Sequence, residues 1–464
     1  MKIHINGAAR TVTGSQYLLE VNGSRLLLEC GMFQGRRFDT YQVNQNFDFD
    51  PTRVDAMILS HAHLDHSGNL PNLVKNGYSG PIYVTPPTAR LTDIVLRDSG
   101  HIQEADALFV NKKRAARGEP PIQPLYTIAD AEHVARHLRE VAYEDPFAPI
   151  PGVVARLVDA GHILGSAAVM LDIEENGRKT RLWFSGDIGR LNLPLLPDPQ
   201  LPRQPDILMM ECTYGDKNHG DLDTAYQEFR DVVVRTVKRG GKIIIPAFAI
   251  GRTQELVYDL NRMVSDKEIP PIPVFVDSPM AVNATDIFQE FSATFDAETQ
   301  MFIRTKMHPA LTFPQLTYIR SVDESKALNT RHEPMVIISA SGMAESGRIL
   351  HHLRNNIEDA RNTIAIVSWQ SPDTLGRRLA DRANKVRIFG EEFIRRAEIA
   401  TIGGLSAHAG QDFLLDYARA ARGNLKQVIL VHGEPRGADP FTEKLKENNI
   451  GPVIYPERFQ SIEL

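Results

Sequence analysis

Residues 1–90 alternate short apolar runs with Gly, Asn and Pro, a pattern that predicts β-strands separated by turns. Residues 91–142 instead have a mostly helical pattern, interrupted by a basic loop with prolines from Lys112 to Pro124. Strand-like runs resume beyond residue 150. The expected strands are Tyr17–Val21, Arg25–Leu28, Ala56–Ser60, Ile82–Val84, Val153–Val158, Ala167–Ile173 and Lys179–Ser185.

The pattern changes after about residue 212, where an apolar strand is repeatedly followed by a loop of small residues and then a helix. Such units predict a parallel sheet with helices on its faces, which binds ligands beyond the carboxyl ends of its strands. Residues 191–206 hold five prolines and are expected to connect the two patterns over the surface. The expected strands and helices are Lys242–Pro246 with Thr253–Met263, Val274–Val276 with Ala281–Phe291, Met335–Ser339 with Glu345–Leu353, Thr363–Val367 with Leu375–Asn384, and, after short strands beyond 388, the helix Gln411–Arg422 and the strand Gln427–Val431.

Composition is that of an ordinary globular enzyme, with 42% apolar and 24% charged residues in a chain of 464, long enough for more than one domain. No apolar stretch is long enough to cross a bilayer, and the N-terminus reads as a strand rather than a signal peptide. Two cysteines, Cys30 and Cys212, exclude a disulfide framework and fit a reducing cytoplasm. Buried packing is the ordinary interpretation of both, with metal binding or nucleophilic chemistry as the alternative. The net charge of −6 does not by itself indicate a nucleic-acid partner. A local basic groove and bound metals would have to hold such a partner.

The most informative stretch is His61-Ala62-His63-Leu64-Asp65-His66, which directly follows an apolar strand. It places three imidazoles and one carboxylate within six positions. Imidazole suits zinc, and a carboxylate adds a hard, anionic ligand. Because ligands so close in sequence are hard to arrange around one tetrahedral ion, they favour two ions side by side, an arrangement built for hydrolysis. A solvated, histidine-rich loop is the alternative.

Further candidate ligands follow other strands. A His or Asp lies near Gly or Ala at each of these places, which leaves room for close approach. A lone His in a loop is usually a surface residue, but several at corresponding strand ends form a constellation. The segments are Asp159-Ala160-Gly161-His162, Ser185-Gly186-Asp187, Ser406-Ala407-His408 and Val431-His432-Gly433-Glu434.

These residues, in this order, resemble the metallo-β-lactamase superfamily, whose hydrolase signature is H-x-H-x-D-H, a later His and an Asp after a strand. Three further segments resemble the additional motifs of its β-CASP nucleases, and the likeness covers essentially the whole chain. That family includes the endonuclease subunit of the pre-mRNA cleavage and polyadenylation factor, its archaeal relatives and ribonuclease J. Without the N-terminal RNA-binding domains of the archaeal members, the chain looks like the compact bacterial type. The three segments are Glu211-Cys212-Thr213-Tyr214-Gly215-Asp216, Ser406-Ala407-His408 and Val431-His432-Gly433-Glu434.

The resemblance implies a role for each matching residue. His61, His63 and His162 with Asp187 would hold one zinc ion, and Asp65, His66 and His432 with the same Asp187 the other. Asp65 also stands among the expected catalytic residues. His408 would be the general acid that protonates the leaving oxygen, oriented by Glu211. A histidine at position 432 goes with the RNA enzymes of the family. Whether Mn replaces Zn stays open.

The substrate backbone must also be held. Ser339-Ala340-Ser341-Gly342, entering a helix, is expected to offer backbone N–H groups to a phosphate, with a plain strand–helix turn as the alternative. For each of the other basic segments, the ordinary interpretation is a charged surface exposed to solvent. The remaining expected contacts are Arg252 within Gly251–Thr253, Thr374 and Arg378 beside Arg377, and a basic path through Arg36-Arg37 and a Lys112-Lys113-Arg114 loop.

The expected fold class is α/β: a metallo-β-lactamase αββα sandwich over residues 1–210 and 389–464, with a parallel-sheet β-CASP domain inserted over 211–388. The expected function is zinc-dependent cleavage of single-stranded RNA at the cleft between two domains, endonucleolytic or from the 5′ end. The alternatives are a hydrolase of a small thioester or ester, a DNA-processing nuclease, and an RNA-binding scaffold with a dead site. We expect no membrane association; a homodimer stays open, and no protein partner is inferable.

Overall fold

The computed structural model describes residues 1–35 and 37–464, with only the backbone of Arg37–Asp39. Arg36 and the side chain of Arg37, expected on a basic path, therefore lie outside the described residues. The chain forms two compact units, which are described separately. Unit 1 comprises Met1–Leu191, Asp198–Asn218 and His408–Leu464; unit 2 comprises Asn192–Pro197 and His219–Ala407. The division expected at 210/211 and 388/389 stays a prediction about domain boundaries.

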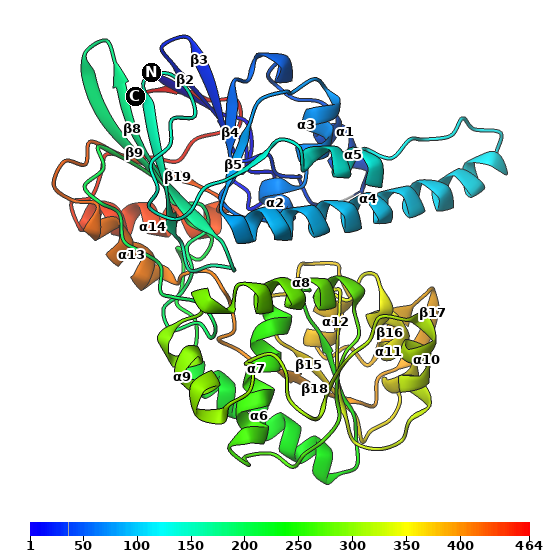
Figure 1. The fold of residues 1–464 in the computed structure, drawn as a ribbon. Coiled ribbons are helices and arrows are strands. Elements are labelled where there is room, and N and C mark those ends of the chain that lie inside the picture. Colours follow the sequence, from blue (N-terminus) through cyan, green and yellow to red (C-terminus); the bar gives the residue numbers. More distant parts are fainter. Residues whose placement is uncertain (36) are drawn as a thin grey trace. The chain divides into compact units, whose positions relative to one another are not determined.

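Unit 1 contains two sheets packed face to face (Figure 1). One sheet has the order β21-β1-β2-β3-β4-β5-β6, and the other β20-β19-β10-β9-β8-β7. The strands of the first are β1 (Lys2–Ile5), β2 (Tyr17–Val21), β3 (Ser24–Leu28), β4 (Ala56–Ile58), β5 (Ile82–Val84), β6 (Leu138–Glu140) and β21 (Ser461–Glu463). Those of the second are β7 (Val153–Asp159), β8 (Ala167–Glu175), β9 (Arg178–Phe184), β10 (Ile207–Glu211), β19 (Gln427–Val431) and β20 (Val453–Ile454).

Strands inside the sheets, such as β4 and β10, are continuous buried runs because both faces of each sheet are covered. Leu26 and Leu28 of β3 point into the core between the sheets, while Leu27 between them packs with the helices outside. In β19, Ile429 faces the inner core and Leu430 the outer helices. Helices therefore cover the outer face of each sheet, and the expected four-layer αββα sandwich is present. Its helices are α1 (Arg37–Gln45), α2 (Leu64–Ser67), α3 (Leu70–Lys75), α4 (Pro86–Ala115), α5 (Ile128–Val134), α13 (Gln411–Ala420) and α14 (Pro435–Glu447).

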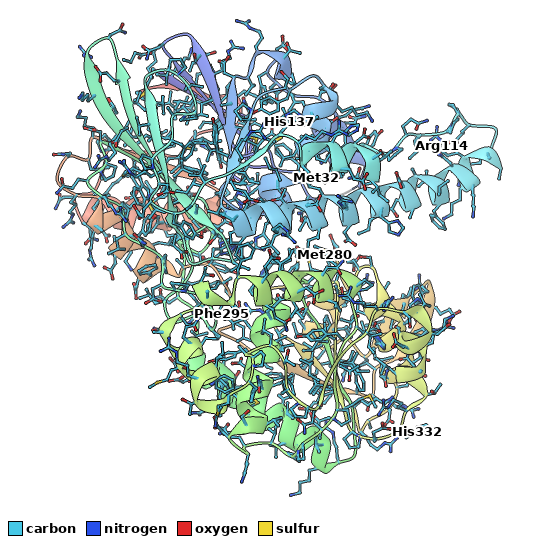
Figure 2. All side chains as sticks on the ribbon, in the orientation of Figure 1. Met32, Arg114, His137, Met280, Phe295 and His332 are labelled. Atoms are coloured by element: carbon cyan, nitrogen blue, oxygen red, sulfur yellow. The ribbon has the colours of Figure 1, made fainter. Side chains whose placement is uncertain are left out.

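Helix α4 is longer than its sequence pattern indicates. Thr85 caps its N-terminus, accepting a hydrogen bond from the Thr88 N–H at 3.3 Å, and the helix continues for 30 residues. Its far end projects beyond the sandwich of unit 1, with Arg114 near that end (Figure 2). The expected loop from Lys112 is therefore wrong at its start, since Lys112–Arg114 form the last turn. Cations there are favoured by the negative end of the helix dipole. Among the described residues, no helix combines the length and apolar character that a membrane span requires.

Unit 2 is built on one parallel sheet of order β13-β12-β14-β11-β15-β18, with helices on both faces (Figure 1). All four expected strand–loop–helix units are present, and the expected inserted parallel sheet is confirmed. The strands are β11 (Ile243–Pro246), β12 (Val274–Val276), β13 (Leu316–Tyr318), β14 (Val336–Ser339), β15 (Thr363–Ile366) and β18 (Glu398–Thr401), with a hairpin of β16 (Lys385–Ile388) and β17 (Glu391–Ile394). The helices are α6 (Leu222–Lys238), α7 (Arg252–Ser265), α8 (Pro279–Glu290), α9 (Ala297–Lys306), α10 (Val322–Thr330), α11 (Arg348–Asn356) and α12 (Leu375–Ala380).

Candidate active site

The expected ligands of unit 1 all lie where strands end. His61 and His63 follow β4, and Asp65 and His66 lie on the short helix α2. His162 follows β7, Asp187 follows β9, His432 follows β19, and Glu211 is the last residue of β10. Because β9, β10 and β19 run parallel, their carboxyl ends meet at one edge of the sheet. His408 precedes α13, and its backbone forms a bridge with Gly189, close to Asp187.

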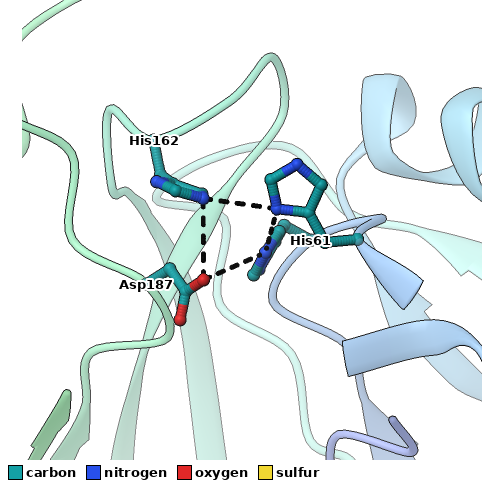
Figure 3. Close-up of side chains that lie close together, drawn as sticks. His61, His162 and Asp187 are labelled. Atoms are coloured by element: carbon teal, nitrogen blue, oxygen red, sulfur yellow. Dashed lines mark hydrogen bonds and ion pairs between the residues drawn. The ribbon is translucent and has the colours of Figure 1, made fainter. Parts of the chain in front are cut away.

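Four of these side chains converge in a first cluster. His61 Nε2 lies 3.1 Å from His63 Nδ1, which lies 3.3 Å from His162 Nε2. Asp187 Oδ2 lies 3.5 Å from both His61 Nε2 and His162 Nε2. Figure 3 shows this carboxylate facing the two rings. Three nitrogens and one oxygen thus surround a single point.

A second cluster adjoins the first across the same aspartate. His66 Nε2 and His432 Nε2 lie 3.3 Å apart, and Asp65 Oδ2 lies 3.4 Å from His432 Nε2. The other oxygen of Asp187, Oδ1, lies 3.2 Å from His66 Nε2. Each oxygen of Asp187 therefore faces a different cluster.

The donor set fits zinc. Tetrahedral zinc with bonds of 2.0–2.1 Å separates neighbouring nitrogen donors by about 3.3 Å. Four neighbouring donor pairs of the first cluster lie 3.1–3.5 Å apart, and all its donor atoms lie within 4.8 Å of one another. Hydrogen bonding does not explain the geometry, because His63 Nδ1 faces two other ring nitrogens at once and carries one proton at most. Buried nitrogen lone pairs that face one another repel, and a cation at their centre would stabilise them.

Glu29 is a site residue that the sequence pattern did not reveal. Its carboxylate is fully buried behind the ligands and lies 2.5 Å from His66 Nδ1. It also accepts a hydrogen bond from the Ser60 hydroxyl at 2.8 Å, and that hydroxyl lies 2.9 Å from His61 Nδ1. With both Nδ1 atoms held by these contacts, the Nε2 atoms of His61 and His66 point into the clusters. The signal available in the sequence was a carboxylate directly after the strand Arg25–Leu28.

Thr213 fixes the orientation of His432 in a similar way. Its hydroxyl donates to the His432 carbonyl at 3.0 Å and lies 3.2 Å from His432 Nδ1. A hydroxyl that donates to the carbonyl accepts from the Nδ1–H, which leaves Nε2 unprotonated toward Asp65.

Charges and burial set the protonation of the site. Burial strongly lowers the pKa of His61 and His162, so these rings are neutral. Burial opposes ionisation of Asp187, but the imidazoles of His432 and His66 outweigh it and hold its pKa well below the usual range. Neutral imidazoles and an ionised carboxylate are the forms that bind metal.

Glu211 and His408 form a hydrogen-bonded pair beside the first cluster. His408 Nδ1 lies 3.1 Å and 3.2 Å from the two oxygens of Glu211, whose carboxylate is fully buried. The other ring nitrogen, Nε2, lies 4.0 Å from Asp187 Oδ2. Burial alone would lower the pKa of His408, but the charge and hydrogen bond of Glu211 raise it to about 9. The ring is therefore a protonated acid at neutral pH.

The expected substrate contacts lie in unit 2, and the structure gives several of them internal partners. The Ser339 hydroxyl donates to the Asp277 carbonyl at 2.7 Å. Arg252 is 7% exposed and paired with Glu255. Thr374 caps α12, while Arg378 is exposed on that helix. Ser341 and Gly342 do not lead directly into a helix, since α11 begins only at Arg348. Contact of these residues with substrate stays a prediction.

The two cysteines are buried, as the ordinary interpretation expects. Burial raises the pKa of both thiols well above the usual range, which disfavours the thiolate that a nucleophile or ligand needs. Among the described residues, neither belongs to a group of potential metal donors.

Three domain families match the chain. Residues 9–159 match the metallo-β-lactamase superfamily. Residues 253–379 match the β-CASP domain, and residues 394–456 a family described as the Zn-dependent metallo-hydrolase RNA specificity domain.

Relatives match over nearly the whole chain. Ribonuclease TTHA0252 of Thermus thermophilus is 38% identical over 437 residues, 94% of this chain and 93% of that protein. The transcription termination factor FttA of Pyrococcus abyssi is 31% identical over 93% of this chain, which spans 66% of that protein. An RNase J-like protein of Methanocaldococcus jannaschii is 28% identical over 99% of this chain and 98% of that protein.

A crystal structure of a protein of unknown function from Enterococcus faecalis has the same fold, with a TM-score of 0.57, 14% identity and coverage of 100% of this chain and 99% of that one. Together with the αββα sandwich and the inserted parallel sheet, these matches decide the family. The chain belongs to the β-CASP ribonuclease family of the metallo-β-lactamase superfamily.

Proposed function

We propose that this protein is a zinc-dependent ribonuclease that hydrolyses phosphodiester bonds of single-stranded RNA. The observation that carries the proposal is the division of Asp187 between two donor clusters, with His408 beside them and hydrogen-bonded to Glu211. One ion would be held by His61, His63, His162 and Asp187. The other would be held by Asp65, His66, His432 and the second oxygen of Asp187.

When bound, two zinc ions neutralise charge on the phosphoryl oxygens and lower the pKa of water toward about 7. The residues of the chain supply the rest. Asp187 links the two donor clusters, since each of its oxygens belongs to a different cluster. Glu29 and Thr213 keep the ring nitrogens of three ligands turned inward.

His408 would donate the proton that the leaving oxygen needs. Glu211 accepts from Nδ1 and so directs Nε2–H toward the clusters. After transfer of that proton, the buried carboxylate of Glu211 favours reprotonation of the ring. General acid catalysis of this kind is worth about 10²–10⁴ in rate.

The similarity to known relatives points to RNA as the substrate. Ribonuclease TTHA0252 covers almost the same length as this chain, and residues 394–456 match a domain described by its RNA specificity. His432 stands where the RNA enzymes of the family have a histidine. The resemblance therefore favours RNA over DNA and over a small thioester.

The test offers the purified protein three substrates: single-stranded RNA, DNA of the same sequence and a small thioester, each with and without chelator. We expect chelator-sensitive cleavage of RNA, with DNA and thioester left nearly intact. Thioester hydrolysis without RNA cleavage would contradict the proposal, as would equal cleavage of DNA. Labelling the RNA at its 5′ or 3′ end distinguishes internal cuts from release of mononucleotides at the 5′ end.

A further inference from the structure

Two large aromatic side chains stand exposed at the carboxyl edge of the unit 2 sheet. Phe248 follows β11 and Trp369 follows β15, and each is 43% exposed. These strands are neighbours in the sheet, pairing Ile243 with Thr363. Since the carboxyl edge of a parallel sheet is where ligands bind, the two rings lie where a substrate is expected.

The loops that carry the two rings are tied together through Gly342. The Phe248 ring packs on this glycine so closely that a Cβ there would lie 3.0 Å from ring atoms. From the other side, buried Gln370 donates to the Gly342 carbonyl at 3.0 Å and to the Ser368 carbonyl at 3.1 Å, bracketing Trp369. The hydroxyl of Thr253 holds the Phe248 carbonyl at 2.7 Å. The backbone that carries each ring is therefore anchored although both rings are exposed.

The surroundings suit a phosphate-linked ligand. Arg378 is exposed on α12, just beyond the Trp369 loop. Its guanidinium contacts the Asp373 carbonyl at 3.5 Å, and no carboxylate of the described residues lies within 4.0 Å to neutralise its charge. Ser341 and Ser371 lie in the same loops and are partly exposed. Aromatic faces next to a cation are the elements that bind single-stranded nucleic acid, stacking on bases and pairing with phosphates.

We propose that Phe248 and Trp369 form a stacking platform for unpaired bases of the RNA, with Gly342 as its floor. This inference rests on the proposed function and adds the groups that bind bases rather than phosphates. Such a platform tolerates any sequence, because every base has a π-face, but it excludes base pairs. It therefore selects single strands.

Trp369 itself reports on the platform. The chain contains two tryptophans, and the other, Trp183, is fully buried. The probes are a 5′-phosphorylated 12-nucleotide oligo(A) and a chain of equal length with an abasic ribose at every position, mixed with the holoenzyme by stopped flow. We expect oligo(A) to quench tryptophan fluorescence before turnover and the abasic chain to leave it unchanged. Equal quenching by both, or by neither, overturns the platform.

The variants are Trp369→Ala, Phe248→Ala and Trp369→Phe, with Phe389→Ala as the matched control, since Phe389 is 51% exposed in the β16–β17 hairpin of the same unit. We expect each of the first two to weaken oligo(A) binding by about 5- to 150-fold while binding of the abasic chain stays unchanged. Trp369→Phe keeps a ring and should bind oligo(A) within a few-fold of the parent.

Loss of binding by Trp369→Ala to both probes alike would overturn the platform, as would parent-like binding of oligo(A) by that variant. Retained RNA cleavage alongside either result would leave the proposed function standing. Quenching by oligo(A) in a protein that cuts no RNA would refute the proposed function and keep the platform. A change in Trp369 fluorescence on adding an apolar peptide, with no change on adding oligo(A), would assign the two rings to a protein partner and overturn the inference.

Discussion

The His408 ring donates from Nδ1 to the buried carboxylate of Glu211, 3.1 Å away, and turns Nε2 toward Asp187. Glu211 is fully buried and also accepts from the Ile188 N–H at 2.6 Å, which holds its carboxylate in place. The fixed carboxylate of Glu211 thus positions the His408 ring beside the donor clusters. This arrangement supports the proposed role of His408 as an acid rather than a ligand.

His408→Ala should lower kcat by about 10²–10⁴ with little change in KM, because the leaving oxygen loses its proton donor. The measurement is cleavage of labelled single-stranded RNA under saturating conditions. His332→Ala, at an exposed histidine outside the site, serves as control. A parent-like kcat for His408→Ala would remove the acid from the mechanism.

A substrate with a sulfur leaving group separates the acid role from a structural one. A thiolate leaves without protonation, so RNA with a bridging phosphorothiolate should be cut by His408→Ala at close to the parent rate. Glu211→Gln should show the same rescue with a smaller initial loss. An equal defect on both substrates would mean that His408 shapes the site instead.

Glu29→Gln should weaken zinc binding by about 10- to 100-fold, since the buried carboxylate orients His66 directly and His61 through Ser60. Competition with a coloured chelator measures this affinity. Glu463→Gln, at an exposed position of strand β21, is the matched control. An unchanged affinity in Glu29→Gln would show that the ligands need no such support.

Asp259 in α7 should make stability depend on pH. Burial raises its pKa to about 7, with Arg262 opposing the shift. The folded protein therefore binds this proton more tightly than the unfolded chain. The free energy of unfolding should fall as pH rises from about 4 to about 7 and level off above, by at most about 4 kcal/mol from this group.

Asp259→Asn should abolish that contribution, stabilising the protein at pH 8 and leaving it nearly unchanged at pH 4. Denaturant unfolding followed by circular dichroism across this range gives the comparison. Asp323→Asn, with a side chain 98% exposed, controls for loss of a carboxylate. The same pH slope in Asp259→Asn and the parent would contradict the expectation.

Asp277 should be critical for the stability of unit 2. Its buried carboxylate accepts from Arg348 Nη1 at 2.7 Å, from His352 Nε2 at 2.6 Å and from the Ser325 hydroxyl at 2.5 Å. Asp277→Ala would leave these groups unpaired, at a cost of about 3–5 kcal/mol in the free energy of unfolding. Thermal unfolding of this variant and of the exposed Asp286→Ala tests it. Equal melting temperatures would show that the network contributes little.

Local patterns were enough to predict much of the fold and the residues that the structure brings together in the two clusters. Neighbouring residues alone predict the inward and outward leucines of β3 and the four strand–loop–helix units. The His61–His66 segment carries its chemistry within six positions. Roles that depend on distant contacts were out of reach: Glu29 is one more strand-end carboxylate until His66 lies beside it. The end of α4 was misplaced because basic residues suit a solvated loop and a last helical turn equally.

The most direct test of the two-metal site is a zinc titration of metal-stripped protein with RNA cleavage as the readout. We expect little cleavage up to one equivalent of zinc per chain and full activity at two, because Asp187 serves both donor clusters. Asp187→Asn should bind less zinc and remain inactive throughout. Full cleavage of RNA with no zinc, or with a single equivalent, would contradict the two-metal site.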